Sequence, residues 1–139
     1  MVIVDSGFWI ALANKQDDFH QSAKTCFPKF QQEGFITTWC VITEACYLLQ
    51  KEIGIDAPTT LLNKVGTGTL HIFELTQRHC PDAIRLMHQY RDLPMDLADA
   101  SLVILAEHLG HGRILSVDQR DFNTYRWKNT KPFQNLLIP

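Results

Sequence analysis

Short apolar runs alternate with longer stretches of helical periodicity along the whole chain. Apolar, β-branched or alternating runs predict strands over residues 2–4, 35–38, 70–75 and 113–117, with a last edge strand over 133–138. Apolar positions at helical spacing predict helices over 7–15, 18–32, 39–53, 58–65, 81–91 and 96–109, and a short helix or loop after residue 118. Because strands and helices alternate, we expect an α/β fold whose mostly parallel sheet is covered on both faces.

A few residues mark where these elements begin and end. Ser6 is a good N-cap for the first helix, and Asp96 is the natural N-cap of the helix that Gly110 closes. Pro28 lies inside the second predicted helix, where it is expected to kink or split the helix.

Composition and charge narrow the class of protein. The 139 residues are 45% hydrophobic and 20% charged, which excludes a disordered chain and predicts one domain over residues 1–139. Lys and Arg number 13 against 15 Asp and Glu, a formal charge of −2. A protein that holds nucleic acid mainly through a large positive excess is therefore excluded. A local basic face, or an acidic site that needs a cation, remains compatible with this balance.

The cysteines and the apolar runs indicate a cytoplasmic protein. Cys26, Cys40, Cys46 and Cys80 form no CxxC pair, so we expect reduced thiols, mostly buried. No apolar run reaches the roughly 18–20 residues that a membrane span needs. The first apolar run lacks a positively charged segment before it and is interrupted early by Asp5, which is not the pattern of a signal peptide.

Two predicted strands are followed directly by an aspartate. Asp5 follows the run 2–4, and Asp118 follows the run that ends at Val117. The carboxyl ends of parallel strands meet at one edge of the sheet, where α/β proteins bind their ligands. Each aspartate could instead cap the turn or helix after it. Because two strands end in this way, a ligand-binding site is favoured over two separate caps.

Two further carboxylates lie on apolar stripes of predicted helices. Glu44 shares a stripe with Val41 and Leu48, and no Lys or Arg lies three or four residues away. The alternative is that Glu44 is only favoured by the dipole of its helix. Asp99 is followed at helical spacing by apolar residues, so we expect its side chain to face inward.

If these four carboxylates converge, their repulsion requires a neutralising partner. Two like charges about 4 Å apart repel by about 4 kcal/mol at an effective dielectric constant of about 20. Protons or a cation must offset this. Oxygen ligands alone suit Mg²⁺ or Mn²⁺ rather than zinc. Such an ion suits phosphodiester hydrolysis by an activated water, with no side-chain nucleophile, and none of the six histidines lies in a catalytic motif.

The order of these short motifs resembles a known family. A strand followed by Asp5-Ser6, then Thr43-Glu44, then Asp99-Ala100-Ser101, then a strand followed by Asp118 and Asp121-Phe122 is similar to the PIN domain. Within that family, the small size and the stretch 93–103 resemble the VapC-type toxin ribonucleases. The resemblance covers almost the whole chain.

The resemblance implies a three-layer α/β/α sandwich and an Mg²⁺- or Mn²⁺-dependent endoribonuclease. Carried over position by position, the catalytic and metal-binding residues are Asp5, Glu44, Asp99 and Asp118, with Ser6, Asp96 and Asp121 as possible supporting residues. VapC-type toxins usually form homodimers and are silenced by a cognate antitoxin, so the resemblance also implies both partners.

The substrate expected for such a site is single-stranded or loop RNA, whose unstacked strand can bend into a cleft. Arg120, Arg126 and Lys128 are candidate phosphate contacts, and they are interleaved with Phe122, Tyr125 and Trp127, which could stack on bases. The alternative is that these aromatic rings pack on the core and the charges are only solvated. Two further functions remain open, a PIN-like module that binds RNA or protein without cutting it and a housekeeping RNA-processing nuclease.

Overall fold

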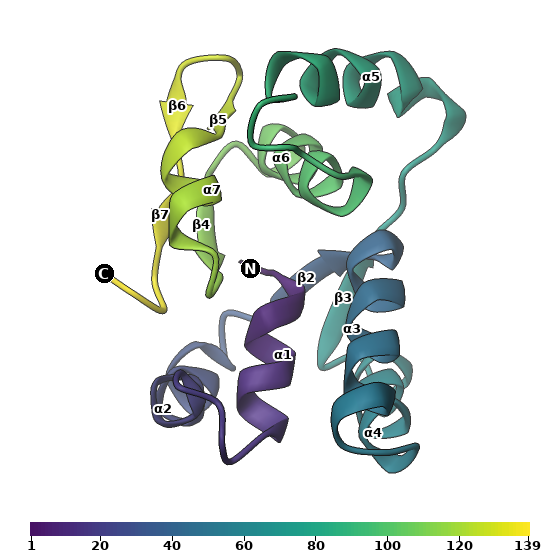
Figure 1. Ribbon diagram of the computed structural model, residues 1–139, viewed down its shortest axis with the longest axis vertical. Coiled ribbons are helices and arrows are strands. Elements are labelled where there is room, and N and C mark those ends of the chain that lie inside the picture. Colours follow the sequence, from purple (N-terminus) through teal and green to yellow (C-terminus); the bar gives the residue numbers. More distant parts are fainter.

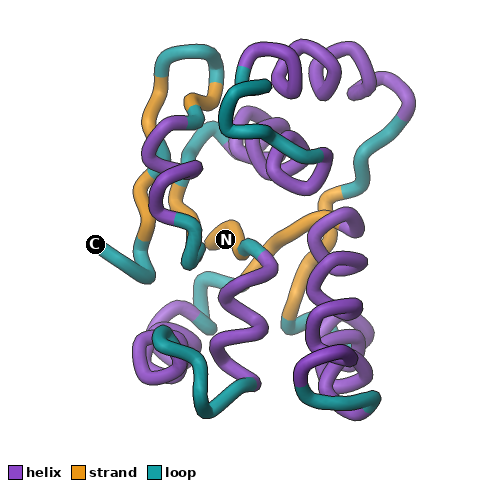
Figure 2. Tube along the Cα trace, in the orientation of Figure 1, coloured by secondary structure: helices purple, strands orange, loops and turns teal.

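The computed structural model describes residues 1–139 and has a parallel sheet at its centre (Figures 1 and 2). Its strands are β1 (Val2–Val4), β2 (Phe35–Thr38), β3 (Leu70–Phe73), β4 (Arg113–Leu115) and β7 (Gln134–Asn135). They lie in the order β3-β2-β1-β4-β7, and every neighbouring pair is parallel. The predicted parallel sheet is therefore confirmed.

Helices cover both faces of this sheet. They are α1 (Ser6–Ala13), α2 (His20–Phe30), α3 (Trp39–Glu52), α4 (Asp56–Gly66), α5 (Cys80–Gln89), α6 (Leu97–Leu109) and α7 (Gln119–Thr124), with a 3₁₀ turn at Gln77–His79. In Figure 1, α1 to α4 lie on one side of the sheet, and α5 and α6 lie on the other. The three-layer α/β/α sandwich is confirmed. None of these helices has the length and apolar character needed to cross a bilayer.

The alternation of side chains along the strands divides the interior into two cores. Val2 and Val4 of β1 pack into the core beneath α1 to α4, whereas Ile3 packs into the core beneath α5 and α6. Leu115 and Ile114 of β4 divide in the same way. All of these side chains are fully buried, as expected for strands covered on both faces.

Two predicted helix details differ from the structure. Asp5, not Ser6, is the N-cap of α1, because the Asp5 carboxylate accepts the Ser6 N–H and Ser6 is already helical. Pro28 does not break α2. Only two residues of α2 follow it, so the missing hydrogen bond between an amide at position 28 and the Lys24 carbonyl affects only the end of the helix.

The C-terminal part of the chain is less regular than the sequence suggests. The expected strand over 133–138 is only the two-residue β7, and β4 ends at Leu115 instead of residue 117. A small antiparallel pair, β5 (Arg126–Trp127) and β6 (Lys131–Pro132), was not predicted. Lys128 and Asn129 form its turn with positive φ angles of 47° and 64°.

The strand order places a topological switch point at the centre of the sheet. From β1 the chain builds outward through β2 and β3 on one side, then returns to place β4 on the other side of β1. Ligands of open α/β sheets bind beyond the carboxyl ends of the strands at such a point. Asp5 follows β1, and the segment from Ser116 to Asp118 follows β4, so both segments lie at this position.

We predict that Leu105→Ala lowers the free energy of unfolding by about 2–5 kcal/mol, because Leu105 on α6 is fully buried and its removal leaves a cavity. Urea titration followed by circular dichroism measures this change. The matched control is Leu62→Ala on α4, where the side chain is 44% exposed and the expected change is within about 0.5 kcal/mol. Equal losses in the two variants would contradict the burial described for α6.

Candidate active site

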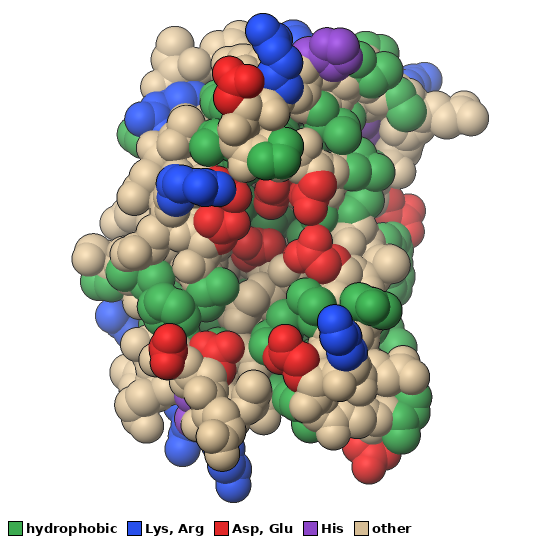
Figure 3. Space-filling view, in the orientation of Figure 1, with side chains coloured by type: hydrophobic (Ala, Val, Ile, Leu, Met, Phe, Trp, Pro, Cys, Tyr) green, Lys and Arg blue, Asp and Glu red, His purple; other side chains and the backbone are tan.

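Acidic side chains gather in one hollow at the carboxyl edge of the sheet. The hollow has a volume of about 410 Å³, and Figure 3 shows acidic residues clustered in the middle of this face. Its carboxylates are Asp5, Asp17, Glu44, Asp96, Asp99, Asp118 and Asp121, and Ser6 also lines it. The structure thus brings together all seven residues that the sequence analysis proposed for the acidic site. We call this hollow the acidic pocket.

Asp5 is buried at the end of β1 and is held by two donors. Its Oδ1 accepts the Ser6 N–H at 2.7 Å, and its Oδ2 accepts the Ser116 hydroxyl at 3.0 Å. Ser116 Oγ also accepts the Asp118 N–H at 3.0 Å. Ser116 therefore connects the ends of β1 and β4 across the switch point. This role of Ser116 was not predicted, although its position between an apolar strand and Asp118 was an available signal.

Glu44 projects from α3 toward the start of α1. It is half-buried and accepts a hydrogen bond from the Ser6 hydroxyl. No Lys or Arg forms an ion pair with it. Glu44 therefore has no basic partner, either on its own helix, as the sequence indicated, or elsewhere in the fold. Ser6 contributes its backbone N–H to one carboxylate and its hydroxyl to another.

Asp99 and Asp96 take different positions at the start of α6. Asp96 is exposed and caps the helix, because its Oδ1 accepts the Asp99 N–H at 2.8 Å, as predicted. Asp99 is half-buried, and its Oδ2 accepts the Tyr125 hydroxyl at 3.0 Å. Burial and the neighbouring Asp99 carboxylate raise the pKa of Tyr125, so its hydroxyl remains a hydrogen-bond donor.

Asp118 and Asp121 belong to one short helix. The Asp118 Oδ1 accepts the Asp121 N–H at 3.4 Å at the start of α7. The Arg120 Nε donates to Asp121 Oδ1 at 3.3 Å. Since the Arg120 side chain is 76% exposed, solvent screens this pair. It is the only Lys or Arg ion pair that any carboxylate of the acidic pocket forms.

Burial and mutual repulsion raise the pKa of three of these carboxylates. Burial raises the pKa of Asp5 to about 6, with smaller contributions from the charges of Glu44 and Asp118. Burial and the charges of Asp96 and Asp5 raise the pKa of Asp99 to about 8. Burial and the neighbouring Asp121 raise the pKa of Asp118 to about 6. Negative charge in the acidic pocket is therefore under-compensated near neutral pH.

The donors of the acidic pocket fit a divalent cation that keeps part of its water shell. The side chains lining it present oxygen donors and no imidazole or thiol, which is the chemistry of Mg²⁺ and Mn²⁺ sites. No three His, Cys, Asp or Glu side chains are grouped closely enough to enclose one ion directly. Since Mg²⁺ is commonly bound through one or two carboxylates and several waters, this spacing still fits a hydrated ion.

Asp17 is the one acidic lining residue that the sequence analysis did not consider. It lies in the loop between α1 and α2, and its Oδ1 accepts the Phe19 N–H at 2.9 Å. No strand end or apolar stripe precedes it, so nothing in the sequence distinguished it from an ordinary loop residue.

The aromatic residues of the segment 120–131 do not form a surface for stacking bases. Phe122, Tyr125 and Trp127 are buried in the core beneath α6. Arg126 is also engaged, because its guanidinium donates to the backbone carbonyls of residues 123, 124 and 125 and so closes the end of α7. Of the two alternatives stated for these rings, packing on the core is confirmed and base stacking is excluded, and the Arg126 Nη1 is not free for phosphate. Arg120 and Lys128 remain exposed.

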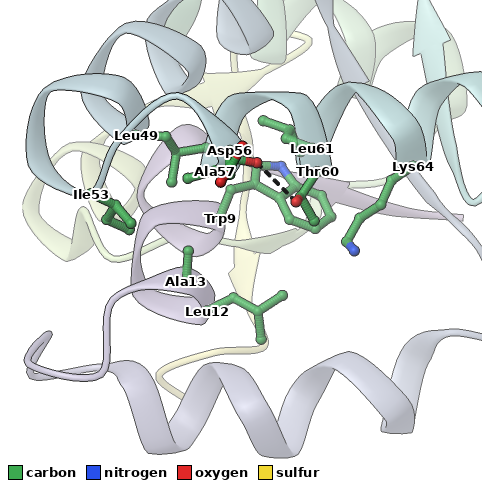
Figure 4. A pocket seen from close by; sticks show the side chains of 10 residues that line it. All are labelled: Trp9, Leu12, Ala13, Leu49, Ile53, Asp56, Ala57, Thr60, Leu61 and Lys64. Atoms are coloured by element: carbon green, nitrogen blue, oxygen red, sulfur yellow. Dashed lines mark hydrogen bonds between the residues drawn. The ribbon is translucent and has the colours of Figure 1, made fainter.

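A second hollow, of about 370 Å³, lies between α1, the end of α3 and α4 (Figure 4). Its lining is mostly apolar and comprises Trp9, Leu12, Ala13, Leu49, Ile53, Ala57 and Leu61 together with Asp56, Thr60 and Lys64. The Trp9 Nε1 is buried without a hydrogen-bond partner. This hollow shares no residue with the acidic pocket and contains one carboxylate and no histidine or cysteine. The acidic residues that the sequence predicted for a site therefore lie in the acidic pocket and not in this hollow.

We predict that the metal-free protein loses stability as pH rises from about 4 to about 8. The raised pKa values mean that the folded state binds more protons than the unfolded state, so the free energy of unfolding is highest below the unfolded-state pKa of 3.8 and falls as pH passes through about 6 and about 8. Asp99→Asn should therefore raise Tm at pH 8 by roughly 2–8 °C. Thermal unfolding in chelator measures this.

The control for this prediction is Asp92→Asn, an equal charge change at an exposed residue outside the acidic pocket. Its Tm should match that of the parent chain at both ends of the pH range. A lower Tm for Asp99→Asn at pH 8 would contradict the repulsion described above.

Comparison with known proteins agrees with this architecture. A sequence model of the PIN domain matches residues 2–128. Ribonuclease VapC26 of Mycobacterium tuberculosis is 24% identical over 125 residues, which cover 90% of this chain and 92% of the relative. The crystal structure of M. tuberculosis VapC20, a sarcin-ricin loop cleaving toxin, matches with a TM-score of 0.77 and 19% identity over 86% of this chain and 91% of that one, a likeness of fold. With a family match over nearly its whole length, the chain belongs to the PIN-domain family.

Proposed function

We propose that this protein is a divalent-metal-dependent endoribonuclease of the VapC type that hydrolyses phosphodiester bonds. The observation that carries the proposal is the convergence of Asp5, Glu44, Asp99 and Asp118, from four separate segments of a PIN fold, on one pocket with a single exposed cation beside it. A set of buried and half-buried carboxylates this poorly compensated is suited to a divalent ion and poorly suited to a purely structural role.

In this proposal the four carboxylates hold a hydrated ion, partly through its waters, and the hydroxyls around them fix their orientation. When bound, Mg²⁺ or Mn²⁺ activates water and offsets charge on the phosphodiester oxygens. Ser6 orients Glu44 and Ser116 orients Asp5, each through a hydrogen bond from its hydroxyl. Asp96 and Asp121 line the same pocket and add negative charge, which strengthens the attraction for a cation.

The proposed substrate is RNA in a single-stranded or loop region. The acidic pocket is an open hollow on the surface, and a bent strand brings its backbone closer to such a hollow than a regular duplex does. Arg120, beside Asp121, and the exposed Lys128 are the proposed phosphate contacts. The relative VapC26 is a ribonuclease, which supports RNA over DNA as the substrate.

We infer that the chain acts as the toxin of a toxin–antitoxin pair in the cytoplasm, as a homodimer that a protein antitoxin silences. VapC20, which shares its fold, is described as a toxin. Exposed apolar side chains, among them Trp39, Tyr47, Ile84 and Leu97, give protein partners a contact surface. The four cysteines are unpaired, in keeping with a reducing compartment. A housekeeping role in RNA processing would use the same chemistry.

A binding module without catalysis is the second candidate. The observation in its favour is that no three acidic side chains enclose a common point and that Asp5, Glu44 and Asp99 already have hydroxyl partners. The two functions differ in whether RNA is cut in the presence of metal.

We predict that Asp5→Asn and Asp99→Asn each reduce RNA cleavage by more than about 100-fold. The loss of a residue that only supports a metal ligand lowers activity by roughly 10–100-fold, and the loss of a residue that holds the ion should lower it further. Cleavage of a labelled RNA containing loops, with Mg²⁺ or Mn²⁺ present, measures this, and excess EDTA should stop it. Asp92→Asn, outside the acidic pocket, should cleave at the parental rate. Cleavage that persists in both pocket variants, or after rigorous removal of metal, would refute the proposed mechanism.

We also predict that saturating Mg²⁺ or Mn²⁺ raises the Tm of the parent chain, because an ion that binds only the folded state stabilises it by about 2.7 kcal/mol at 100 times its Kd. Thermal unfolding across a metal titration measures the shift. In the double variant Asp5→Asn, Asp99→Asn the shift should largely disappear. An equal shift in the parent and the double variant would mean that the ion binds elsewhere.

A further inference from the structure

Tyr125 combines a fixed ring with a hydroxyl that reaches the acidic pocket. The residue is fully buried, and its ring packs edge-to-face against Phe122 at 5.2 Å and against Tyr90 at 5.1 Å between ring centroids. Rings packed in this way have little freedom to rotate or shift. The hydroxyl oxygen therefore has a fixed position, and from there it donates to Asp99 Oδ2 at 3.0 Å.

This hydroxyl is the only protein group that hydrogen-bonds to the Asp99 carboxylate. Oδ1 of Asp99 accepts no hydrogen bond from the protein, and the single contact to Oδ2 fixes the orientation of the carboxylate. Glu44 and Asp5 also accept hydrogen bonds from hydroxyl groups, but the donors are Ser6 and Ser116, which lie close to the ends of strands. Tyr125 differs because it approaches from the core beneath α6.

Tyr125 is also joined to the far side of the acidic pocket through α7. Asp118 caps the first turn of this six-residue helix, and the Tyr125 N–H donates to the Asp121 carbonyl at 2.8 Å at its end. The Arg126 guanidinium closes the same end by binding three carbonyls. The position of the Tyr125 hydroxyl is thus set by the helix that presents Asp118 and Asp121.

We propose that Tyr125 is a positioning residue that orients Asp99 so that one carboxylate oxygen stays available to a divalent ion. This inference rests on the proposed function and adds to it a residue that contributes no ligand of its own. An outer hydrogen-bond partner of this type typically changes metal affinity or activity by roughly 10–100-fold. Without the hydroxyl, Asp99 loses its one fixed contact and must be ordered by the ion itself.

The test is Tyr125→Phe, which removes the hydroxyl and keeps the buried ring. Isothermal titration of the metal-free protein with Mn²⁺ should show a Kd raised roughly 10-fold or more, and RNA cleavage should show a lower kcat with little change in KM. The Tm in chelator should stay close to that of the parent, because the ring packing is retained. An unchanged Mn²⁺ Kd, or a variant that does not fold, would overturn the proposal.

Tyr90→Phe is the matched control. The Tyr90 hydroxyl accepts the Arg126 N–H and has no contact with a pocket carboxylate, so the same deletion there should leave the Mn²⁺ Kd unchanged. A double-mutant cycle with Asp99→Asn identifies the route. If Tyr125 acts through Asp99, then Tyr125→Phe has no further effect on the Mn²⁺ Kd in the Asp99→Asn background, whereas additive effects would refute that route.

The Mn²⁺ binding and RNA cleavage experiments also distinguish failure of this inference from failure of the proposed function. A parent chain that neither binds Mn²⁺ nor cleaves RNA would end the proposed function. A parent chain that does both, with a Tyr125→Phe variant that equals it, would end only the role of Tyr125.

Discussion

The parallel pairing of β1 with β4 is the constraint on which the rest of the site depends. These strands come from opposite ends of the chain, yet Ile3 lies opposite Ile114 and Val4 opposite Leu115. With that register, the residues after both strands emerge at the same edge of the sheet. Asp5 and Asp118 then become neighbours, and the Ser116 hydroxyl connects them with two hydrogen bonds.

The two hydrophobic cores stabilise an arrangement that the carboxylates oppose. Around the acidic pocket, α1, α3 and α6 each supply an acid or its hydroxyl partner from the first turns of a helix or just before it. Each of those helices also buries an apolar face against the sheet, and this packing fixes the position of its first turns. Strong packing away from the site therefore maintains electrostatic repulsion within it, a pattern typical of functional sites.

The sequence predicted those parts of the site whose signal is local. Asp5 and Asp118 follow apolar strands, and Asp99 interrupts an apolar stripe, so each was recognisable from its neighbours. The contacts of Tyr125 with Asp99 and of Ser116 with Asp5 were not predicted, because each joins residues far apart along the chain. For Tyr125 the sequence left base stacking and core packing both open, since an aromatic residue among arginines and lysines has the same local pattern whether it is buried or exposed.

The fold shows the same division between local and distant information. Long periodic segments such as α3 and α6 were predicted to within one or two residues of their observed bounds. The paired strands β5 and β6, two residues each, carry no periodicity that a sequence pattern could detect. The capping of α1 by Asp5 was missed for a related reason, because aspartate and serine are equally good N-caps and only the backbone conformation separates them.

The crowding of acids has a consequence for proton balance. Because the pKa values of Asp5, Asp99 and Asp118 are raised, the metal-free chain takes up protons when it folds near neutral pH. If a divalent ion occupies the acidic pocket as proposed, its binding displaces those protons into the solvent. The heat measured for such binding therefore includes the ionisation enthalpy of the buffer, and the apparent affinity for the ion increases with pH over the range in which these carboxylates titrate.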